Sequence, residues 1–180
     1  MIENGLYIVS ESYFDKFKKL GCSFKDSKGE NRPVFCCLKD LKFDGLYWAI
    51  PLSEITEEKI ENGTIDRVKK YMNYKENSLG WAYYHIAKTN KPAIYNISSV
   101  LPITDHYIER KWILNQKHFV IPYTSAIKII RRKFKRILSE ENRFPNKFEQ
   151  HITLIKNILI NELREINITQ KDIATTKEVL

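Results

Sequence analysis

The segment 31–53 constrains the fold of this chain more than any other stretch, and it reads NRPVFCCLKDLKFDGLYWAIPLS. It predicts two short strands, 34–38 and 46–50, joined by a polar turn. A proline stands at the outer end of each strand, and because proline lacks the N–H that a sheet ladder needs, both positions suit strand ends. The predicted hairpin therefore places Arg32 and Ser53 near the same end of one sheet, where a cation and a hydroxyl can contact phosphate together.

Apolar alternation and helical periodicity in the rest of the chain predict a mixed structure. We expect further strands at 5–9, 79–87, 92–98, 100–103 and 119–122. We expect helices at 12–20, 125–138 and 148–166, with helical pieces such as 64–73 in the polar segment 53–74. Because strands come mostly before helices, the fold class is α+β, with a compact, strongly twisted antiparallel sheet surrounded by helices. The length suits one domain, 1–180, with a polar tail, 167–180, that frays or contacts a neighbour.

Charge is the most informative global property of the chain. The 30 Lys and Arg residues against 22 Asp and Glu residues give a net charge of +8, which favours nucleic acid or an anionic membrane face as partner. No apolar run is long enough to span a bilayer, and the acidic N-terminal residues do not suit a secretion signal, so we expect a cytoplasmic protein. The three cysteines have neither disulfide nor zinc-site spacing, and Cys36 and Cys37 suit burial in a strand, so we expect no metal and no cofactor.

Three blocks of the sequence follow one another in a recognisable order. The first is the Arg-Pro pair at 32–33, and the second is the Tyr-Trp strand that ends in Ile-Pro-Leu-Ser at 50–53. The third is IYNISSVLPIT at 94–104. Together they resemble the toxins of type III toxin–antitoxin systems, the endoribonucleases of the ToxN/AbiQ superfamily, with the CptN and TenpN branches closest. The resemblance covers roughly residues 7–136.

The resemblance implies an activity and a partner. It implies a metal-independent, sequence-preferring endoribonuclease that cleaves single-stranded RNA by attack of the 2′-hydroxyl, leaving a 2′,3′-cyclic phosphate and a 5′-hydroxyl. Cellular or phage mRNA would be the substrate. The implied partner is a small non-coding antitoxin RNA, folded as a pseudoknot, which forms a closed toxin–RNA assembly and inhibits cleavage until phage infection releases the toxin. The implied fold is a twisted sheet ringed by helices, distantly like the SH3-like toxins of type II systems.

Candidate catalytic residues follow from the same blocks. Ser53 matches the family hydroxyl and would hydrogen-bond the phosphate or the 2′-hydroxyl; alternatively, it caps a helix that begins after it. Arg32 would hold the scissile phosphate, with a surface salt bridge to Glu30 as the alternative. Family members often carry a second serine after the first and a lysine soon after it. Here Glu54 follows Ser53, Thr56 stands about where one branch has its lysine, and Lys59 is the first lysine downstream.

A histidine is the remaining candidate for proton transfer. His106 lies beside Asp105, just after the third block, and an imidazole beside a carboxylate suits acid–base chemistry near neutral pH. The alternative is an incidental histidine in a turn.

The predicted helix 125–138 carries the strongest candidate RNA-binding face. Opposite its apolar stripe lie five basic residues: Lys128, Arg131, Arg132, Lys135 and Arg136. Such clustering favours a polyanion, and a membrane surface is the alternative. Further candidates are Lys39, Lys69, Lys70 and Tyr47, whose ring stacks on a base or packs in the core.

Three other functions compete with the endoribonuclease. A non-catalytic basic RNA-binding module would use the same helix. A DNA-binding regulator is disfavoured because no helix-turn-helix pattern stands out. A serine hydrolase is disfavoured because no G-x-S-x-G motif surrounds Ser53.

Overall fold

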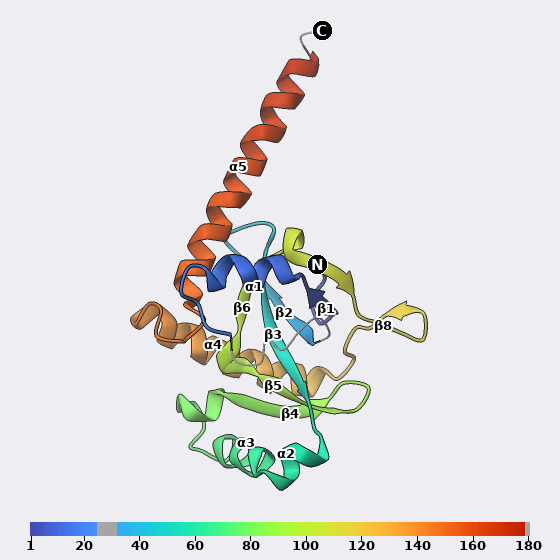
Figure 1. Ribbon diagram of the computed structural model, residues 1–180, viewed down its shortest axis with the longest axis vertical. Coiled ribbons are helices and arrows are strands. Elements are labelled where there is room, and N and C mark those ends of the chain that lie inside the picture. The colour runs from blue at the N-terminus through green and yellow to red at the C-terminus, as the bar shows by residue number, and fades with distance from the viewer. Residues whose placement is uncertain (25–31, 179–180) are drawn as a thin grey trace.

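Seven strands form one antiparallel sheet in the computed structural model, which describes residues 1–24 and 32–178, with side chains as far as Ile168 (Figure 1). The strands lie in the order β4-β5-β3-β2-β1-β7, and β6 pairs with β3. Their bounds are β1 (Leu6–Val9), β2 (Pro33–Lys39), β3 (Leu46–Glu54), β4 (Tyr84–Lys88), β5 (Pro92–Asn96), β6 (Leu101–Thr104) and β7 (Ile108–Lys111). A separate small hairpin consists of β8 (Ile113–Leu114) and β9 (Lys117–His118).

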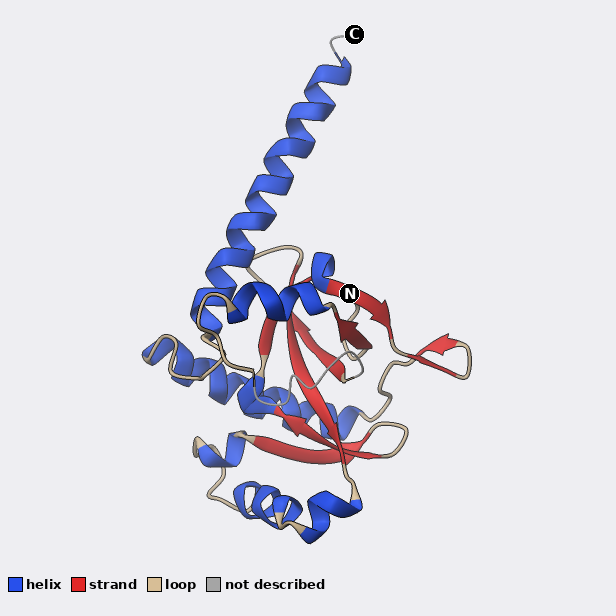
Figure 2. Cartoon of the chain, in the orientation of Figure 1, coloured by secondary structure: helices blue, strands red, loops and turns tan. Residues whose placement is uncertain are grey.

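Helices cover both faces of the sheet (Figure 2). They are α1 (Glu11–Lys18), α2 (Glu57–Glu61), α3 (Thr64–Met72), α4 (Thr124–Arg143) and α5 (Ile152–Glu178). Three short 3-10 helices are η1 (Gly80–Ala82), η2 (Ile97–Ser99) and η3 (Asp105–Tyr107).

Two hydrophobic cores result from this arrangement, one on each face. The core under α4 includes Phe35, Trp48, Ile50, Ile130 and Phe134. The core under α1 and the start of α5 includes Tyr13, Phe17, Val34, Cys36 and Leu159. Alternation explains the split, because successive residues of β2 and β3 point to opposite faces. Beyond this core, α5 continues away from the body of the molecule (Figure 1).

The central strand β3 changes its pairing partner along its length, and this change shapes the site. Its first four residues pair with β6, and its last three pair with β5. Pro51 lies at the changeover, where the missing N–H removes no ladder bond. As a result, β5 and β6 follow one another along the same edge of β3, and the turn η2 fills the break between them.

The structure confirms the α+β class and most of the predicted elements. The predicted hairpin forms and is longer than expected, and the predicted strand 5–9 and helices 12–20 and 125–138 are present with shifted ends. Three strands were not predicted, β7, β8 and β9, because they consist partly of charged or exposed residues.

Three predictions were wrong in detail. The segment 79–87 begins as η1 rather than as a strand, because the Ser78 hydroxyl accepts from the Trp81 amide and turns the chain. The segment 119–122 is not a strand and makes only the isolated bridge between Gly5 and Val120. The last helix begins at Ile152 rather than at 148, after His151 in a left-handed conformation. Its backbone continues to Glu178, through most of the expected tail.

Candidate active site

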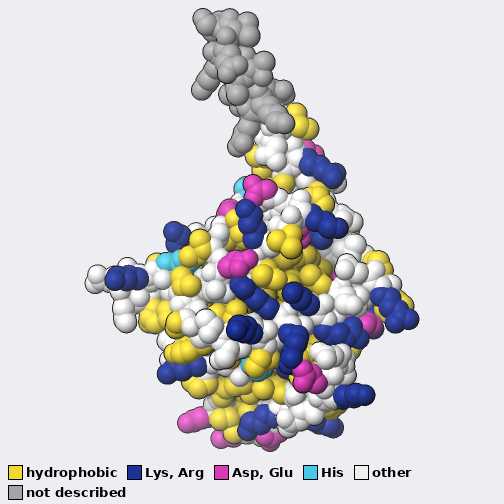
Figure 3. Space-filling model, turned by 180° about the vertical axis from the view of Figure 1, so that it is seen from behind, with side chains coloured by type: hydrophobic (Ala, Val, Ile, Leu, Met, Phe, Trp, Pro, Cys, Tyr) yellow, Lys and Arg dark blue, Asp and Glu magenta, His cyan; other side chains and the backbone are white. Residues whose placement is uncertain are grey.

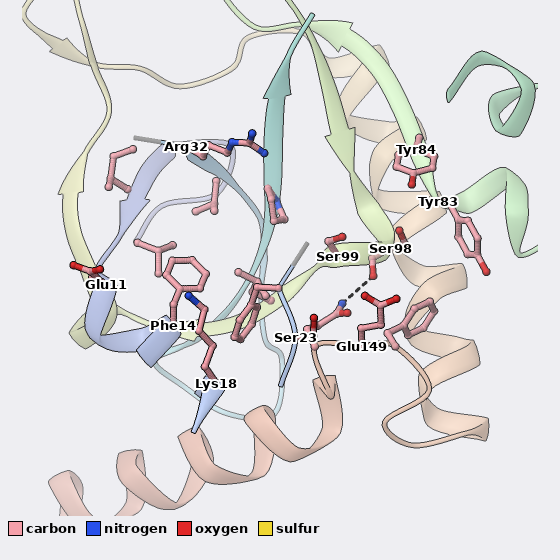
Figure 4. A pocket seen from close by; sticks show the side chains of 18 of the residues that line it. Glu11, Phe14, Lys18, Ser23, Arg32, Tyr83, Tyr84, Ser98, Ser99 and Glu149 are labelled. Carbon is pink, nitrogen blue, oxygen red and sulfur yellow. Dashed lines mark hydrogen bonds between the residues drawn. The ribbon is translucent and has the colours of Figure 1, made fainter. Parts of the chain in front are cut away.

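The hairpin brings Arg32 and Ser53 to the same end of the sheet. Strand β2 begins at Pro33, directly after Arg32, and Val34 lies opposite Pro51. Ser53 follows Pro51 on the same face of β3, since alternate residues of a strand share a face. The Arg32 side chain extends from the end of β2 toward β3 (Figure 4). Glu30, the expected alternative partner of Arg32, lies outside the described residues.

The Ser53 hydroxyl is held by the amide of Asn96. Its Oγ accepts a hydrogen bond of 3.0 Å from Asn96 Nδ2, which also lies 3.4 Å from the Pro51 carbonyl oxygen. A carbonyl oxygen can only accept, so the amide nitrogen must be the atom that faces both groups. The Ser53 Oγ therefore acts as an acceptor toward Asn96, and its own proton remains for a further partner. Ser53 is not a helix cap, because Thr56 caps α2.

A cleft of about 330 Å³ opens beside these residues, where β3 changes partner. Among the described residues, three cationic side chains line it: Lys18, Arg32 and Lys147. Its hydroxyls come from Ser23, Ser98, Ser99, Tyr71, Tyr83 and Tyr84, and its apolar rings from Phe14, Phe24 and Phe148. Carboxylates of Glu11, Glu109 and Glu149 also reach it (Figure 4). Ser53 is 6% exposed and is not among the residues that line the cleft; it lies two residues beyond Pro51, which does line it.

Three tyrosines form one end of the cleft. The ring of Tyr71 on α3 lies 5.4 Å from that of Tyr83 and 5.6 Å from that of Tyr84, centroid to centroid. Tyr84 pairs with Asn96 across β4 and β5, so the tyrosine cluster stands next to the amide that holds Ser53. Aromatic rings beside cations are the groups that bind single-stranded nucleic acid through stacking and charge.

A buried lysine lies under β4 and was not predicted. Lys133 is 1% exposed; its ammonium donates a 2.7 Å hydrogen bond to the Tyr84 carbonyl and lies 4.6 Å from the Trp81 ring centroid. Burial and the charge of Arg132 lower the pKa of Lys133 to about 8. Burial, together with the charge of Lys133, lowers the pKa of His85 to about 4. The hydrogen bond from Lys133 stabilises β4, the strand that carries Tyr84 and His85.

Thr56 and Lys59 lie directly after the strand that carries Ser53. The Thr56 hydroxyl accepts from the Lys59 amide at 3.3 Å, and the Lys59 ammonium donates to the Glu54 carbonyl at 2.7 Å. Glu54 itself forms an ion pair with Lys91. Lys59 is therefore folded back toward the residue after Ser53, whereas the Thr56 side chain serves as a helix cap.

His106 is not brought to this site. It lines a different depression, between η3 and α5. The neighbouring Thr104 lies opposite Leu46, at the start of β3, whereas Ser53 lies seven residues further along the same strand. At the rise of an extended strand, the separation is roughly 23 Å. His106 and Ser53 therefore cannot act on one phosphate in this structure.

The basic face of α4 is smaller than its sequence indicates. Arg131 donates to the Cys37 carbonyl and pairs with Glu3. Arg136 donates to the Asn77 carbonyl and pairs with Glu140. Both guanidinium groups therefore stabilise the fold.

Three of the five basic residues predicted on this face remain exposed. Arg132 pairs with Glu76 and lies over the Trp81 ring, while Lys128 and Lys135 form no ion pair within the described part of the chain. Seen from behind, several Lys and Arg side chains gather near the middle of the face (Figure 3).

The other predicted RNA-binding residues differ in accessibility. Lys69 and Lys70 are exposed on α3, and Lys39 pairs with Asp44 at the hairpin turn. Tyr47 is 8% exposed and belongs to the core under α1, so its ring offers little surface for stacking.

Three further findings concern the thiols, the metal-binding side chains and the helices of the described residues. Cys36 and Cys37 are buried, as predicted, and burial raises the pKa of both thiols to about 12, which makes them poor nucleophiles. Among the side chains described, those of residues 1–24 and 32–168, no three or more His, Cys, Asp or Glu are grouped so that they could hold a metal ion. None of the helices described is both long and apolar enough to cross a membrane.

Comparison with known proteins finds similarity to solved structures. No protein-family model matches the chain, and no curated protein matches it in sequence. A solved structure described as "A processed non-coding RNA regulates a bacterial antiviral system" is similar at 15% sequence identity, over 88% of each chain, with a TM-score of 0.37.

Proposed function

We propose that this chain is the toxin of a type III toxin–antitoxin system, an endoribonuclease that cleaves single-stranded RNA without a metal ion. The observation that carries the proposal is the placement of Arg32 and an oriented Ser53 hydroxyl at the same end of the sheet, beside a cleft lined by cations, hydroxyls and rings. The sequence blocks that resemble the ToxN/AbiQ superfamily contain both residues.

The chemistry requires little from the protein. The RNA supplies its own nucleophile, the 2′-hydroxyl, which attacks the adjacent phosphorus and expels the 5′-oxygen of the next nucleotide. Negative charge increases on the non-bridging oxygens, and fixed cations and hydroxyl donors stabilise it. Arg32 would supply the cation, and the Ser53 proton, which Asn96 leaves available, would hydrogen-bond the phosphate or the 2′-oxygen. Lys59 would contribute a second positive charge if the segment after β3 turns toward bound RNA.

The antitoxin would be a small RNA pseudoknot that occupies the cleft and extends onto the basic surfaces. Lys128 and Lys135 on α4 and Lys69 and Lys70 on α3 would contact its phosphates. Several copies of toxin and RNA would close into one assembly, which keeps RNA substrates out of the site until phage infection.

A non-catalytic RNA-binding module is the second candidate, and one observation favours it. Ser53 is 6% exposed and is not part of the cleft wall, so a nuclease requires RNA binding to reach it by a small movement of the neighbouring side chains. A pure binder requires no such movement.

Substitution separates the two functions. In a nuclease, Ser53→Ala and Arg32→Ala each reduce RNA cleavage by about 100-fold or more and relieve growth arrest on expression, as loss of one transition-state donor does. Ser12→Ala, which removes an exposed hydroxyl on α1, is the control and should stay toxic. If Ser53→Ala remains fully toxic while folded, the chain acts by binding. Short tandem repeats and a terminator upstream of the coding region would independently support the antitoxin RNA.

A further inference from the structure

Gln150 occupies an unusual position in the wall of the cleft. It follows the ring of Phe148 by two residues and lies in the loop before α5. The side chain is only 5% exposed, although glutamine is normally a surface residue. A buried amide must satisfy both its nitrogen and its oxygen, so its partners show what the position requires.

The amide nitrogen is held by the break between β5 and β6. Gln150 Nε2 donates to the Ser98 carbonyl at 2.8 Å and to the Val100 carbonyl at 3.1 Å. These two carbonyls lie in the segment between β5 and β6, where β3 changes its partner, and the amide gives both of them a donor. Because both partners can only accept, the orientation of the amide is fixed by chemistry.

The amide oxygen of Gln150 has no comparable partner among the residues described. Gln150 Oε1 receives no hydrogen bond from the described part of the chain. With the nitrogen turned to the backbone, the cleft wall presents a fixed acceptor on a side chain that cannot rotate without losing two hydrogen bonds. Rings of Phe148, Tyr83 and Tyr84 line the same cleft, together with the cation of Arg32.

We propose that Gln150 is the base-reading residue of this cleft, and that its Oε1 accepts a hydrogen bond from the exocyclic amino group of a nucleobase, favouring adenine or cytosine. A planar base would lie between the aromatic rings, and its phosphate would face Arg32. Adenine N6 and cytosine N4 are amino donors, whereas uracil carries an acceptor, O4, at the equivalent edge. The cleft volume of about 330 Å³ is on the scale of small-molecule sites. This assignment rests on the proposed function for its ligand class.

Binding to uncleavable RNA tests the assignment apart from catalysis. Single-stranded hexanucleotides with 2′-fluoro sugars lack the nucleophile, and fluorescence anisotropy gives their affinity for the full chain. Two comparisons change one amino group: cytidine against uridine, and adenosine against purine riboside, which lacks only the 6-amino group. The amino-bearing member of each pair should bind about three- to tenfold more tightly, as one hydrogen bond provides.

The matched variant is Gln150→Lys, because lysine can still donate to both backbone carbonyls but offers no acceptor. Its added charge strengthens binding of every RNA alike, so the ratio within each pair is the readout. We expect that ratio to fall to about one, with the thermal unfolding midpoint recording whether the variant is folded. Equal binding of both members by the unchanged chain overturns the assignment without any variant. A ratio that survives in folded Gln150→Lys also overturns it, because another residue must then read the base.

Parallel incubation with unmodified RNA keeps the two proposals apart. Base preference without cleavage would refute the nuclease and leave the base-reading role of Gln150 intact. Cleavage without base preference would refute that role and leave the nuclease intact.

Discussion

Acidification should destabilise this protein through one partly buried histidine. Burial and the charge of Lys133 lower the pKa of His85 from an ordinary 6.5 to about 4. Its Nδ1 is buried and finds no hydrogen-bond partner among the residues described. As the pH falls below 6.5, the unfolded chain therefore takes up a proton that the folded chain refuses until about pH 4. The free energy of unfolding decreases through that window and is unaffected above it.

The size of the loss follows from the pKa difference. Each pH unit in the window is worth about 1.4 kcal/mol, so between pH 7 and pH 4.5 the loss approaches about 2 kcal/mol once the partial exposure of the ring is allowed for. Urea unfolding at the two pH values measures it. The variant His85→Phe keeps a ring of similar shape but cannot titrate, so its stability should fall by about 2 kcal/mol less than that of the unchanged chain.

Other groups that titrate in this range contribute equally to both proteins and cancel in the comparison. His106→Gln, which removes an exposed histidine, is the control and should retain the full loss. If His85→Phe and the unchanged chain lose the same free energy on acidification, the reasoning about burial beside Lys133 is refuted.

Three further predictions concern the site and the basic surface. Asn96→Asp replaces the donor to Ser53 with an acceptor and places a carboxylate near the Pro51 carbonyl, so kcat for RNA cleavage should fall at least about tenfold with little change in KM. Charge reversal of Lys128 and Lys135 to glutamate should weaken RNA binding at least about tenfold and flatten its salt dependence. Arg131→Ala should lower the free energy of unfolding by about 2 kcal/mol, because the guanidinium bonds the Cys37 carbonyl and a carboxylate.

Each of these has a control and a contradicting outcome. Lys111→Glu with Lys117→Glu, two exposed lysines outside α4, matches the charge change and should affect RNA binding less. Equal losses for both lysine pairs would mean that net charge, not the α4 surface, determines binding. If kcat is unchanged in Asn96→Asp, the orientation of the Ser53 hydroxyl by Asn96 plays no part in catalysis. If Arg131→Ala unfolds with the same free energy as the unchanged chain, Arg131 does not stabilise the fold and is again a candidate for RNA binding.

Local patterns predicted the hairpin because its determinants are local. The prolines and the alternating residues of β2 and β3 lie within one short segment. The position of Arg32 and Ser53 at the same end of the hairpin could therefore be predicted. Strand β7 could not, because its sequence IERK is charged and exposed and depends on β1 for pairing.

The cleft depends on contacts between distant segments. Its walls come from α1, β3, β4, η2 and the loop before α5, so no sequence window contains it. No sequence motif surrounds Gln150. Its structural role depends on the carbonyls of Ser98 and Val100, which accept hydrogen bonds from its amide and lie about 50 residues earlier in the chain. Lys133 did carry a signal: it lies three residues after Ile130 and four before Ile137, within the buried stripe of α4. Its position in that stripe, rather than its charge, predicts burial.

The most direct test of the central claim is the chemistry of the RNA ends. Purified protein is incubated with single-stranded RNA in excess EDTA, and both new ends are mapped. The proposal predicts cleavage that EDTA does not affect, with a 2′,3′-cyclic phosphate on one fragment, a 5′-hydroxyl on the other, and strong loss in Ser53→Ala. Intact RNA, cleavage abolished by EDTA, or fragments with 5′-phosphate ends would contradict it.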